Sequence, residues 1–341
     1  MTGVASVSAG GAHTMVIKQD GSLWGMGGNG RGQLGDGTTT RRSYPVQVMT
    51  SVASVSGGRY HTMVIKQDGS LWGMGGNGWG QLGDGTTTDR MTPVQGMTGV
   101  ASVSAGGEHT MVIKQDGSLW GMGANRYGQL GDGTTTSRLI PVQVMTGVAT
   151  VAAGRDHTMV IKQDGSLWGM GANLSGQLGN STTTNHMTPV QVMTSVASVS
   201  GGRYYTMVIK QDGSLWAMGL NYSGQLGDGT TTTRRSYPVQ VMTGVASVSA
   251  GCMHTMVIKQ DGSLWGMGAN RFGELGDGTT TNRLIPVQVM TGVASVSGGD
   301  FYTMVIKQDG SLWAMGWNYL GQLGDGTTTP RKTPVPVVSG G

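Results

Sequence analysis

Histidine and cysteine are the side chains of this sequence that most readily act as metal ligands, bases or nucleophiles. One segment recurs along the chain and carries a ring side chain at the same place in each copy: His13, His61, His109, His157, Tyr205, His254 and Tyr302. Equivalent atoms of separate repeats are not expected to converge within the roughly 2 Å that a metal demands of its ligands. We therefore predict buried, hydrogen-bonded His side chains, which Tyr can partly replace, and no metal site.

Two other patterns could suggest catalysis or cofactor binding. Cys252 lies two residues before His254, but no third group that would orient a Cys–His pair is in view. The motifs Gly25-x-Gly27-x-x-Gly30 and Gly73-x-Gly75-x-x-Gly78 match the dinucleotide fingerprint, yet no helix follows that could point its N-terminus at a pyrophosphate. The sequence therefore predicts no catalytic residue and no cofactor.

Acidic and basic segments also fall short of a ligand site. Each Gly-Asp-Gly-Thr-Thr-Thr segment, as at Gly35–Thr40, offers one carboxylate where a calcium loop needs several oxygens, so we expect a turn-stabilising Asp. Arg pairs occur only at Arg41-Arg42 and Arg234-Arg235, a thin stripe for phosphates. With 12% charged residues and a net charge of +4, the sequence allows nucleic acid as a partner but does not indicate it.

The repeated segment runs from His13 to Gly27 and organises the whole chain. Its Trp recurs at Trp24, Trp72, Trp120, Trp168, Trp216, Trp265 and Trp313. The spacing is 48 residues, with one interval of 49 caused by an extra Thr within Thr230–Thr233. Seven units therefore fill residues 1–341, and a fixed period in this range is typical of a solenoid, a propeller or an array.

Each unit contains four short apolar runs, which we call strands A to D. In the first unit they are Val4–Ser8, Thr14–Ile17, Leu23–Met26 and Pro45–Val48. The Asp-Gly pair between the second and third runs predicts a β-hairpin, and the leading Pro of the fourth places it at a sheet edge. Four antiparallel strands without a helical period make one blade, and seven blades suit a closed, single-domain, all-β propeller. A β-solenoid is the less favoured alternative, because the terminal units look like the others and not like caps.

The short links between strand D and the next strand A suggest how the ring closes. Met49-Thr-Ser51 is short enough to join adjacent antiparallel strands. If each blade takes its outer strand from the preceding unit, Pro334–Val337 pairs beside Val4–Ser8, and the N- and C-terminal strands together close one blade. The chain starts inside a unit, since Met1–Val4 repeats Met97–Val100, which is compatible with a domain trimmed from a longer protein.

Composition points to a folded, soluble chain. Its 63 Gly stand at turns between apolar strands, and the single Cys252 excludes an intramolecular disulfide framework. No apolar run approaches the roughly 18 residues that span a bilayer, and Met1–Val4 lacks the charged and apolar regions of a signal peptide. We expect a monomer without membrane contact, in a compartment that the sequence leaves open.

These motifs resemble the regulator of chromosome condensation repeats, which form seven-bladed propellers. The resemblance covers all seven units and rests on the Gly-Gly-x-x-His turn, as at Gly57–His61, the Asp-Gly hairpin, and Trp-Gly-Met-Gly-x-Asn-x-x-Gly-Gln-Leu-Gly, as at Trp72–Gly83. Relatives include a nucleotide exchange factor for a small GTPase, an inhibitor of β-lactamases and a plant light receptor, which implies a face that docks another protein. The exchange factor uses a wedge inserted in one blade, and no unit here has an insertion larger than one Thr, so exchange activity is not expected.

The nearly identical units differ in three short windows. The first precedes strand B, the second follows strand C, and the third follows the Thr run and contains basic residues such as Arg42, Arg90, Arg138, His186, Arg235, Arg283 and Arg331. Antiparallel order puts the A–B and C–D connections at one end of every blade. All three windows therefore share one face, which we call the loop face; the opposite face carries the unvarying Lys-Gln-Asp-Gly turns.

Every Arg, Tyr and Phe of the chain lies in or beside these windows, and Arg, Tyr and Trp dominate protein interfaces. We predict that the loop face binds a protein, or less favourably a glycan, through Arg59, Tyr60, Trp79, Arg126, Tyr127, Arg155, Arg203, Tyr204, Tyr222, Arg271, Phe272, Phe301, Trp317 and Tyr319. The richest predicted arc lies in the second and third units. Two alternatives stay open: an amplified or designed repeat without a specific partner, and a hydrolase or lyase with its site at the mouth of the central channel.

Overall fold

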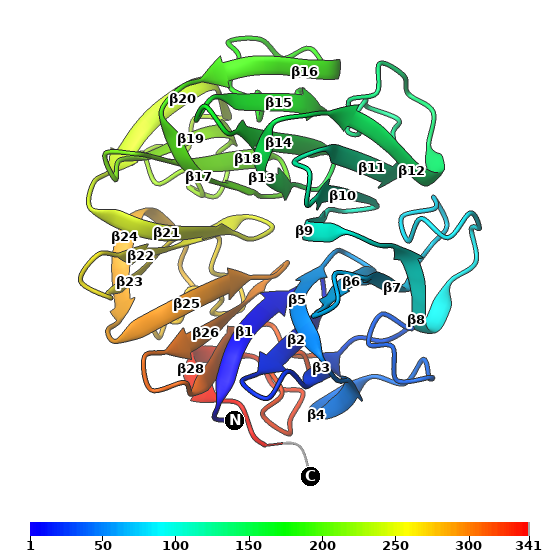
Figure 1. Cartoon of the computed structure of the whole chain (residues 1–341). Helices are drawn as coiled ribbons and strands as arrows, with labels where there is room; N and C mark the ends of the chain where they lie inside the picture. Colours follow the sequence, from blue (N-terminus) through cyan, green and yellow to red (C-terminus); the bar gives the residue numbers. More distant parts are fainter. Residues whose placement is uncertain (340–341) are drawn as a thin grey trace.

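Seven four-stranded antiparallel sheets form a ring around a central axis in the computed structural model, which describes residues 1–339 (Figure 1). No helix occurs within these residues. The predicted all-β, seven-bladed propeller is therefore confirmed. Blade 1 is β1–β4, blade 2 is β5–β8, and the remaining blades follow in chain order to blade 7, which is β25–β28.

The strands repeat with nearly constant lengths. The A strands are β1 (Val4–Ala9), β5 (Val52–Gly57), β9 (Val100–Ala105), β13 (Val148–Ala153), β17 (Val196–Gly201), β21 (Val245–Ala250) and β25 (Val293–Gly298). The B strands are β2 (His13–Lys18), β6 (His61–Lys66), β10 (His109–Lys114), β14 (His157–Lys162), β18 (Tyr205–Lys210), β22 (His254–Lys259) and β26 (Tyr302–Lys307). The C strands are β3 (Leu23–Gly27), β7 (Leu71–Gly75), β11 (Leu119–Gly123), β15 (Leu167–Gly171), β19 (Leu215–Leu220), β23 (Leu264–Gly268) and β27 (Leu312–Gly316). The D strands are β4 (Arg42–Met49), β8 (Arg90–Met97), β12 (Arg138–Met145), β16 (His186–Met193), β20 (Arg234–Met242), β24 (Arg283–Met290) and β28 (Arg331–Pro336).

Within each blade the A strand is innermost and the D strand outermost. Each A strand contacts the A strands of both neighbouring blades, and β1 contacts β5 and β25 in this way, so these strands surround the axis. The D strand pairs only with strand C of its own blade, which confirms the edge position that its Pro predicts. It begins at Arg42 in blade 1, three residues earlier than the apolar pattern indicates, because Arg42 already pairs with Gly27.

The prediction that N- and C-terminal strands share a sheet is wrong. β28 pairs with β27 in a blade built entirely from the last unit, and it does not lie beside β1 in a sheet. The short D–A link instead crosses from the outer edge of one blade to the inner strand of the next, along the hairpin turns. Val52 N donates to Gly21 O of the preceding blade over 3.0 Å, and Gln67 N donates to Ser51 O over 2.9 Å.

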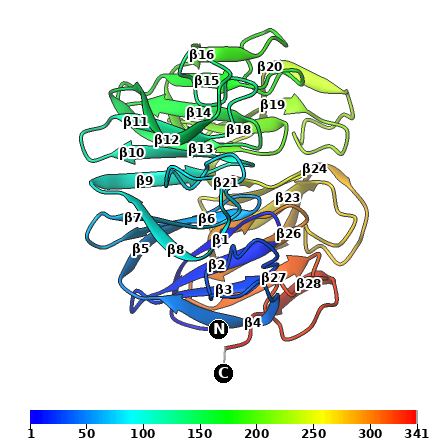
Figure 2. The same cartoon turned by 90° about the vertical axis from the view of Figure 1, so that its right-hand side faces the viewer.

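Met1 completes the ring in place of a shared strand. Leu312 N donates to Met1 O over 3.0 Å, and the terminal amine contacts Val337 O. In blade 1, Met49 occupies this position opposite Leu23. Residues 1–3 therefore serve the junction of blades 7 and 1 as the D–A links serve the other junctions, and the start of the chain lies beside the last described residues in two views (Figures 1 and 2).

The hydrophobic core is divided among the seven boundaries between blades. Between blades 2 and 3, Met63 and Ile65 of β6 pack against Val112 of β10, and the half-buried Trp120 packs beside them. Strand B is buried on both sides, as its unbroken apolar run predicts. The recurring Trp therefore belongs to the packing between blades.

Candidate ligand-binding face at the loop end of the propeller

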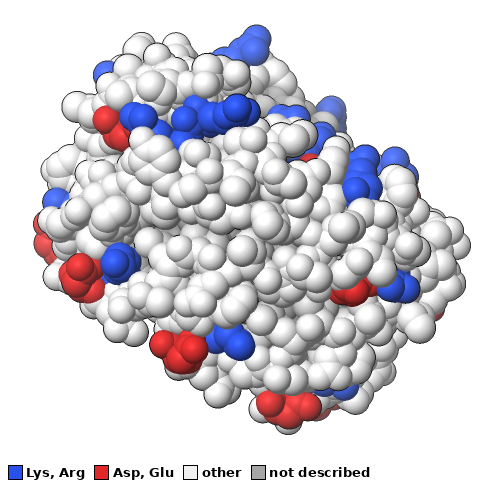
Figure 3. Space-filling model, turned by 90° about the horizontal axis from the view of Figure 1, so that it is seen from above, with Lys and Arg blue, Asp and Glu red and all other residues white. Residues whose placement is uncertain are grey.

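The A–B and C–D connections meet at one end of every blade. In blade 1, Gly28 N donates to Ala12 O over 2.7 Å, which ties the C–D loop to the A–B turn. The seven A–B turns surround the mouth of the central channel. Figure 3 shows adjoining acidic and basic side chains along one edge of the ring and mainly basic ones along the opposite edge. The predicted assignment of loops and turns to opposite ends is therefore correct.

The His positions link consecutive blades and do not form a chemical site. Each His Nε2 lies 2.8 to 3.0 Å from a Thr hydroxyl of the next blade, as in the pair His13–Thr62. Thr62 Oγ1 donates to Gln33 O over 2.7 Å, so it must accept its other hydrogen bond from a protonated Nε2. His13 Nδ1 is then unprotonated, and it has no partner within residues 1–339. The predicted buried hydrogen-bonding role is confirmed.

Tyr replaces His at two blades by reaching farther. Tyr302 OH donates to His13 O and also accepts a hydrogen bond from Thr14 over 3.2 Å. Both ring types need the Gly three residues earlier, because a Cβ at Gly10 would lie 2.3 Å from His13 Cε1. The second Gly of the Gly-Gly-x-x-His sequence is thus a packing requirement at the boundary between blades.

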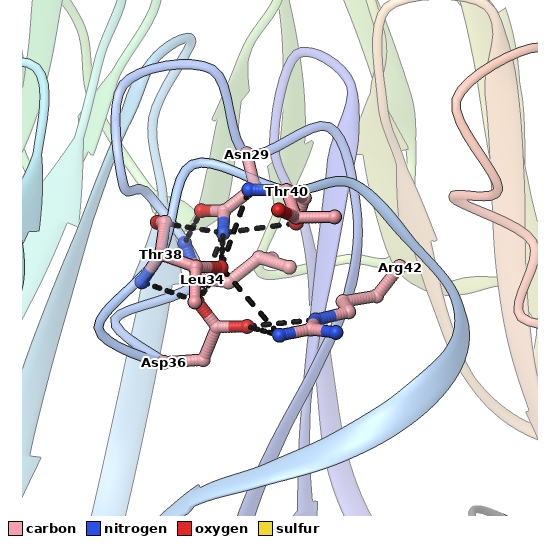
Figure 4. Close-up of polar contacts among 6 residues, drawn as sticks. All are labelled: Asn29, Leu34, Asp36, Thr38, Thr40 and Arg42. Atoms are coloured by element: carbon pink, nitrogen blue, oxygen red, sulfur yellow. Dashed lines mark hydrogen bonds and ion pairs between the residues drawn. The ribbon is translucent and has the colours of Figure 1, made fainter.

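A hydrogen-bonded network fixes each C–D loop (Figure 4). In blade 1 the buried Asn29 Nδ2 donates to Asp36 Oδ1 over 3.0 Å and to the carbonyl oxygens of Thr38 and Thr40, over 3.0 and 3.1 Å. Asp36 Oδ2 accepts from Arg42 Nε over 2.8 Å. Burial works against ionisation of Asp36, but the hydrogen bonds from Thr38 and Arg42 lower its pKa overall. The Asp is therefore saturated by the chain's own donors, as the prediction of a turn-stabilising residue requires.

This network changes the interpretation of the third variable window. At equivalent positions of six blades, a basic residue of this window pairs with the loop Asp and so has a structural role. These residues are Arg42, Arg90, Arg138, Arg235, Arg283 and Arg331. In blade 4 the pair becomes neutral, with Asn180 Nδ2 and His186 Nε2 2.8 Å apart. The coordinated change of both partners was a sequence signal for this pairing.

The predicted recognition residues of blades 2 and 3 form two contact groups. The Arg126 guanidinium carbon lies 5.8 Å from the Trp79 ring centre and 5.4 Å from that of Tyr127, and its Nη2 is 3.3 Å from Glu108 Oε2. The Arg59 guanidinium lies 4.9 Å from the Tyr60 ring centre. Such cation–π contacts restrain long side chains.

A second group lies at the boundary of blades 6 and 7. Phe272 is 5.7 Å from Phe301, 6.4 Å from Trp317 and 6.3 Å from Tyr319 between ring centres, with edge-to-face or tilted geometry. Tyr319 remains 54% exposed. This aromatic cluster is larger than either group in blades 2 and 3, which the sequence indicated as the richest arc. Arg271 lies beside it, 5.6 Å from the Phe272 ring centre.

Of the remaining predicted residues, Arg155 and Arg203 line the channel mouth, and Tyr204 contacts both of them. The Tyr204 ring stands between two basic side chains, 5.7 Å from the Arg155 guanidinium and 5.0 Å from that of Arg203. Tyr222 is 60% exposed. Sequence reasoning did not single out Asp300 as a functional residue, although it occupies the position of Arg59, Arg155 and Arg203 in its own unit and lines the same cavity.

Fold and loop geometry together define a repeat propeller with a constant framework and a variable loop face. A family model of the RCC1-like domain matches residues 97–340, and models of the regulator of chromosome condensation (RCC1) repeat match residues 4–33, 20–65, 52–81 and 68–113. The chain therefore belongs to the RCC1 repeat family, as its motifs predicted.

Solved structures agree on the fold. Human WBSCR16 is 23% identical, with 87% of this chain and 84% of that one covered and a TM-score of 0.79. Yeast RCC1 (Prp20) bound to Kap60 is 18% identical, with coverages of 93% and 83% and a TM-score of 0.85. Prp20p of Saccharomyces cerevisiae, described with its binding to Gsp1p and histones, is 19% identical, with coverages of 95% and 87% and a TM-score of 0.85.

No curated protein sequence matches this chain. Among the described residues no helix is long and apolar enough to pass through a membrane. Nor do those residues contain a group of three or more His, Cys, Asp or Glu side chains suited to holding a metal ion.

Proposed function

We propose that this chain is a non-enzymatic binding protein that recognises a protein partner through its loop face. The observation that carries the proposal is the contrast between framework and loops. The Asn29–Asp36 hydrogen bond recurs in every blade, as an Asn–Asn pair in blade 4, while the side chains held above it differ. Preorganised aromatic and Arg side chains lose little conformational entropy on binding, which favours affinity.

Charge and exposure support a protein partner. Every hairpin turn carries one Lys and one Asp, whose charges cancel. The net charge of +4 therefore comes from residues at the loop end. Half-exposed aromatic side chains stand there, with Trp79 42% exposed and Tyr60 38% exposed. Apolar anchors within a basic surface fit an acidic protein better than an uncharged glycan. RCC1 (Prp20), which shares the fold, binds Kap60.

The experiment compares two double variants as immobilised bait in an extract of the source cell. The double variant Tyr60→Ala with Trp79→Ala should fail to retain a protein that the unmodified chain retains specifically. Once purified, that protein should bind the unmodified chain at least about tenfold more tightly than the double variant, since loss of hot-spot side chains costs about 2 kcal/mol each. The matched control, Lys66→Ala with Lys114→Ala, lies at the turn end and should leave retention unchanged. Equal retention by both variants would contradict the loop face, and no specific retention would favour a repeat without a partner.

A further inference from the structure

The mouth of the central channel holds a cavity of about 160 Å³ at the loop end. Its walls are the Gly-rich A–B turns of all seven blades. One position of this turn, two residues before the first residue of strand B, differs from blade to blade. Arg59, Arg155 and Arg203 occupy this position in blades 2, 4 and 5, with Cys252 in blade 6 and Asp300 in blade 7. Side chains from five blades thus face one small space.

Hydrogen-bond donors outnumber acceptors in this space. Arg203 Nε is buried without a partner among residues 1–339, and Arg203 Nη1 donates to the sulfur of Cys252, a weak acceptor, over 3.7 Å. A buried donor without an acceptor costs about 1 to 3 kcal/mol. An oxygen acceptor entering the mouth would remove that penalty.

The one acidic side chain of the mouth does not satisfy the guanidinium groups. Among residues 1–339, Asp300 forms no ion pair within 4.0 Å and no side-chain hydrogen bond. Burial raises the pKa of its carboxyl group, against the opposing charges of Arg59, Arg203 and Arg155. Arg155 Nε also lies 3.5 Å from Asp156 Oδ2. Three cations therefore face two carboxylates, and the excess positive charge lies in a partly enclosed site, where charge interactions are stronger than in open water.

We propose that the channel mouth binds a carboxylate group, which accepts hydrogen bonds from Arg155 and Arg203 and is held in the positive field of all three Arg side chains. Planar guanidinium groups match carboxylate oxygens in geometry as well as in charge. The carboxylate comes either from a small free acid or from an acidic side chain presented on a protein. Only the second source rests on the proposed function; the site itself needs no protein partner.

The test is isothermal titration calorimetry with succinate and with a hexaglutamate peptide, both at one fixed ionic strength. Arg155→Gln with Arg203→Gln should weaken binding at least about tenfold, because both donors and two charges are lost. Asp300→Asn should tighten binding, because it removes the competing carboxylate. Arg41→Gln with Arg234→Gln removes two Arg charges at the same end but outside the mouth, and binding should hardly change.

A second measurement needs no substitution. Cys252 is the only cysteine and lines the cavity, so an occupied site should slow its alkylation by iodoacetamide. Burial raises the pKa of the Cys252 thiol to about 11, and the reaction is best followed at high pH. Tight binding of succinate identifies a free acid as sufficient, whereas binding of the peptide alone identifies a carboxylate carried on a chain.

Absence of binding by both ligands, or equal weakening by the Arg41 and Arg234 variant and by the Arg155 and Arg203 variant, would overturn the carboxylate site. Such a failure would leave the proposed function standing if the Tyr60 and Trp79 variant still lost its partner. The two proposals therefore fail separately.

Discussion

His13 Nε2 lies 2.8 Å from Thr62 Oγ1 across the boundary between blades 1 and 2, and the same pairing recurs at four further boundaries. The imidazoles are fully buried, and burial lowers the pKa of His13, His157 and His254 to about 4. For His61 and His109 it is lowered to about 3, with a further contribution from neighbouring His side chains. The boundaries between blades are therefore sensitive to acid.

We expect the free energy of unfolding to fall as the pH decreases from about 6.5 to 5. In this window the unfolded chain takes up protons on its His side chains, while the folded chain does not. Each buried His contributes up to about 1.4 kcal/mol per pH unit. Urea unfolding at several pH values measures the slope. His109→Tyr, which copies Tyr205, should reduce the slope by the amount that corresponds to one bound proton. An unchanged slope would show that His109 does not titrate differently in the folded and unfolded states.

The hairpin turn provides the second prediction. Gly21 has a φ of 77°, whereas Asp20 has a negative φ, so the turn needs one left-handed residue. Gly21→Val should lower the free energy of unfolding by about 1 kcal/mol or more, because a β-branched residue is strained there. Gly30→Val is the control, since φ is not left-handed there and no atom lies within 4 Å of an added Cβ. Equal effects in thermal unfolding would contradict the turn assignment.

Blade 6 carries an acidic residue where the other blades have Gln. Glu274 Oε2 accepts from Phe272 N over 2.7 Å, as Gln225 Oε1 accepts from Ser223 N over 3.0 Å. Glu274 Oε1 is buried without a partner among the described residues, and burial raises the pKa of the carboxyl group. A carboxyl group whose pKa is raised by folding stabilises the fold only at low pH and opposes it once ionised.

Glu274→Gln should therefore raise the thermal midpoint at pH 7.5 and have little effect near pH 4, where Glu274 is protonated in the folded state. Gln225→Glu is the reverse substitution in blade 5 and should lower the midpoint at pH 7.5 alone. The same shift at both pH values would mean that ionisation of Glu274 is not the cause.

The sequence predicted the blades well because their information is local. The Asp-Gly hairpin and the edge Pro lie within one unit, and this unit recurs at a fixed period. The unbroken apolar run of strand B indicates that neighbouring blades cover both of its faces. The closure was mispredicted because Met49-Thr50-Ser51 is short enough both for a shared strand and for a link between separate blades. Only the register of Met1 opposite Leu312 decides between them.

Arg42 and Arg59 show what the sequence could not separate at the loop face. Both are basic residues in variable windows, yet Arg42 is held by Asp36 while Arg59 lines the channel mouth. Their roles depend on the conformation of a long loop without periodicity. The meeting of Phe272 with Trp317 depends likewise on how two neighbouring units are placed, which no local pattern encodes.

The aromatic cluster of blades 6 and 7 gives the last prediction. Trp317 packs 6.4 Å from both Phe272 and Phe301 and 6.2 Å from Tyr319 between ring centres, and it lies at a site where the other units have Gly, Ala or Leu. We expect Trp317→Ala to weaken partner binding by about 2 kcal/mol, mainly through faster dissociation, because a central aromatic anchor is lost. Surface plasmon resonance measures both rates. Leu220→Ala, at the equivalent position of blade 5, is the control and should leave both rates nearly unchanged. If Trp317→Ala slowed association alone, the residue would act on encounter and not as an anchor, and the contact would have to lie elsewhere on the loop face.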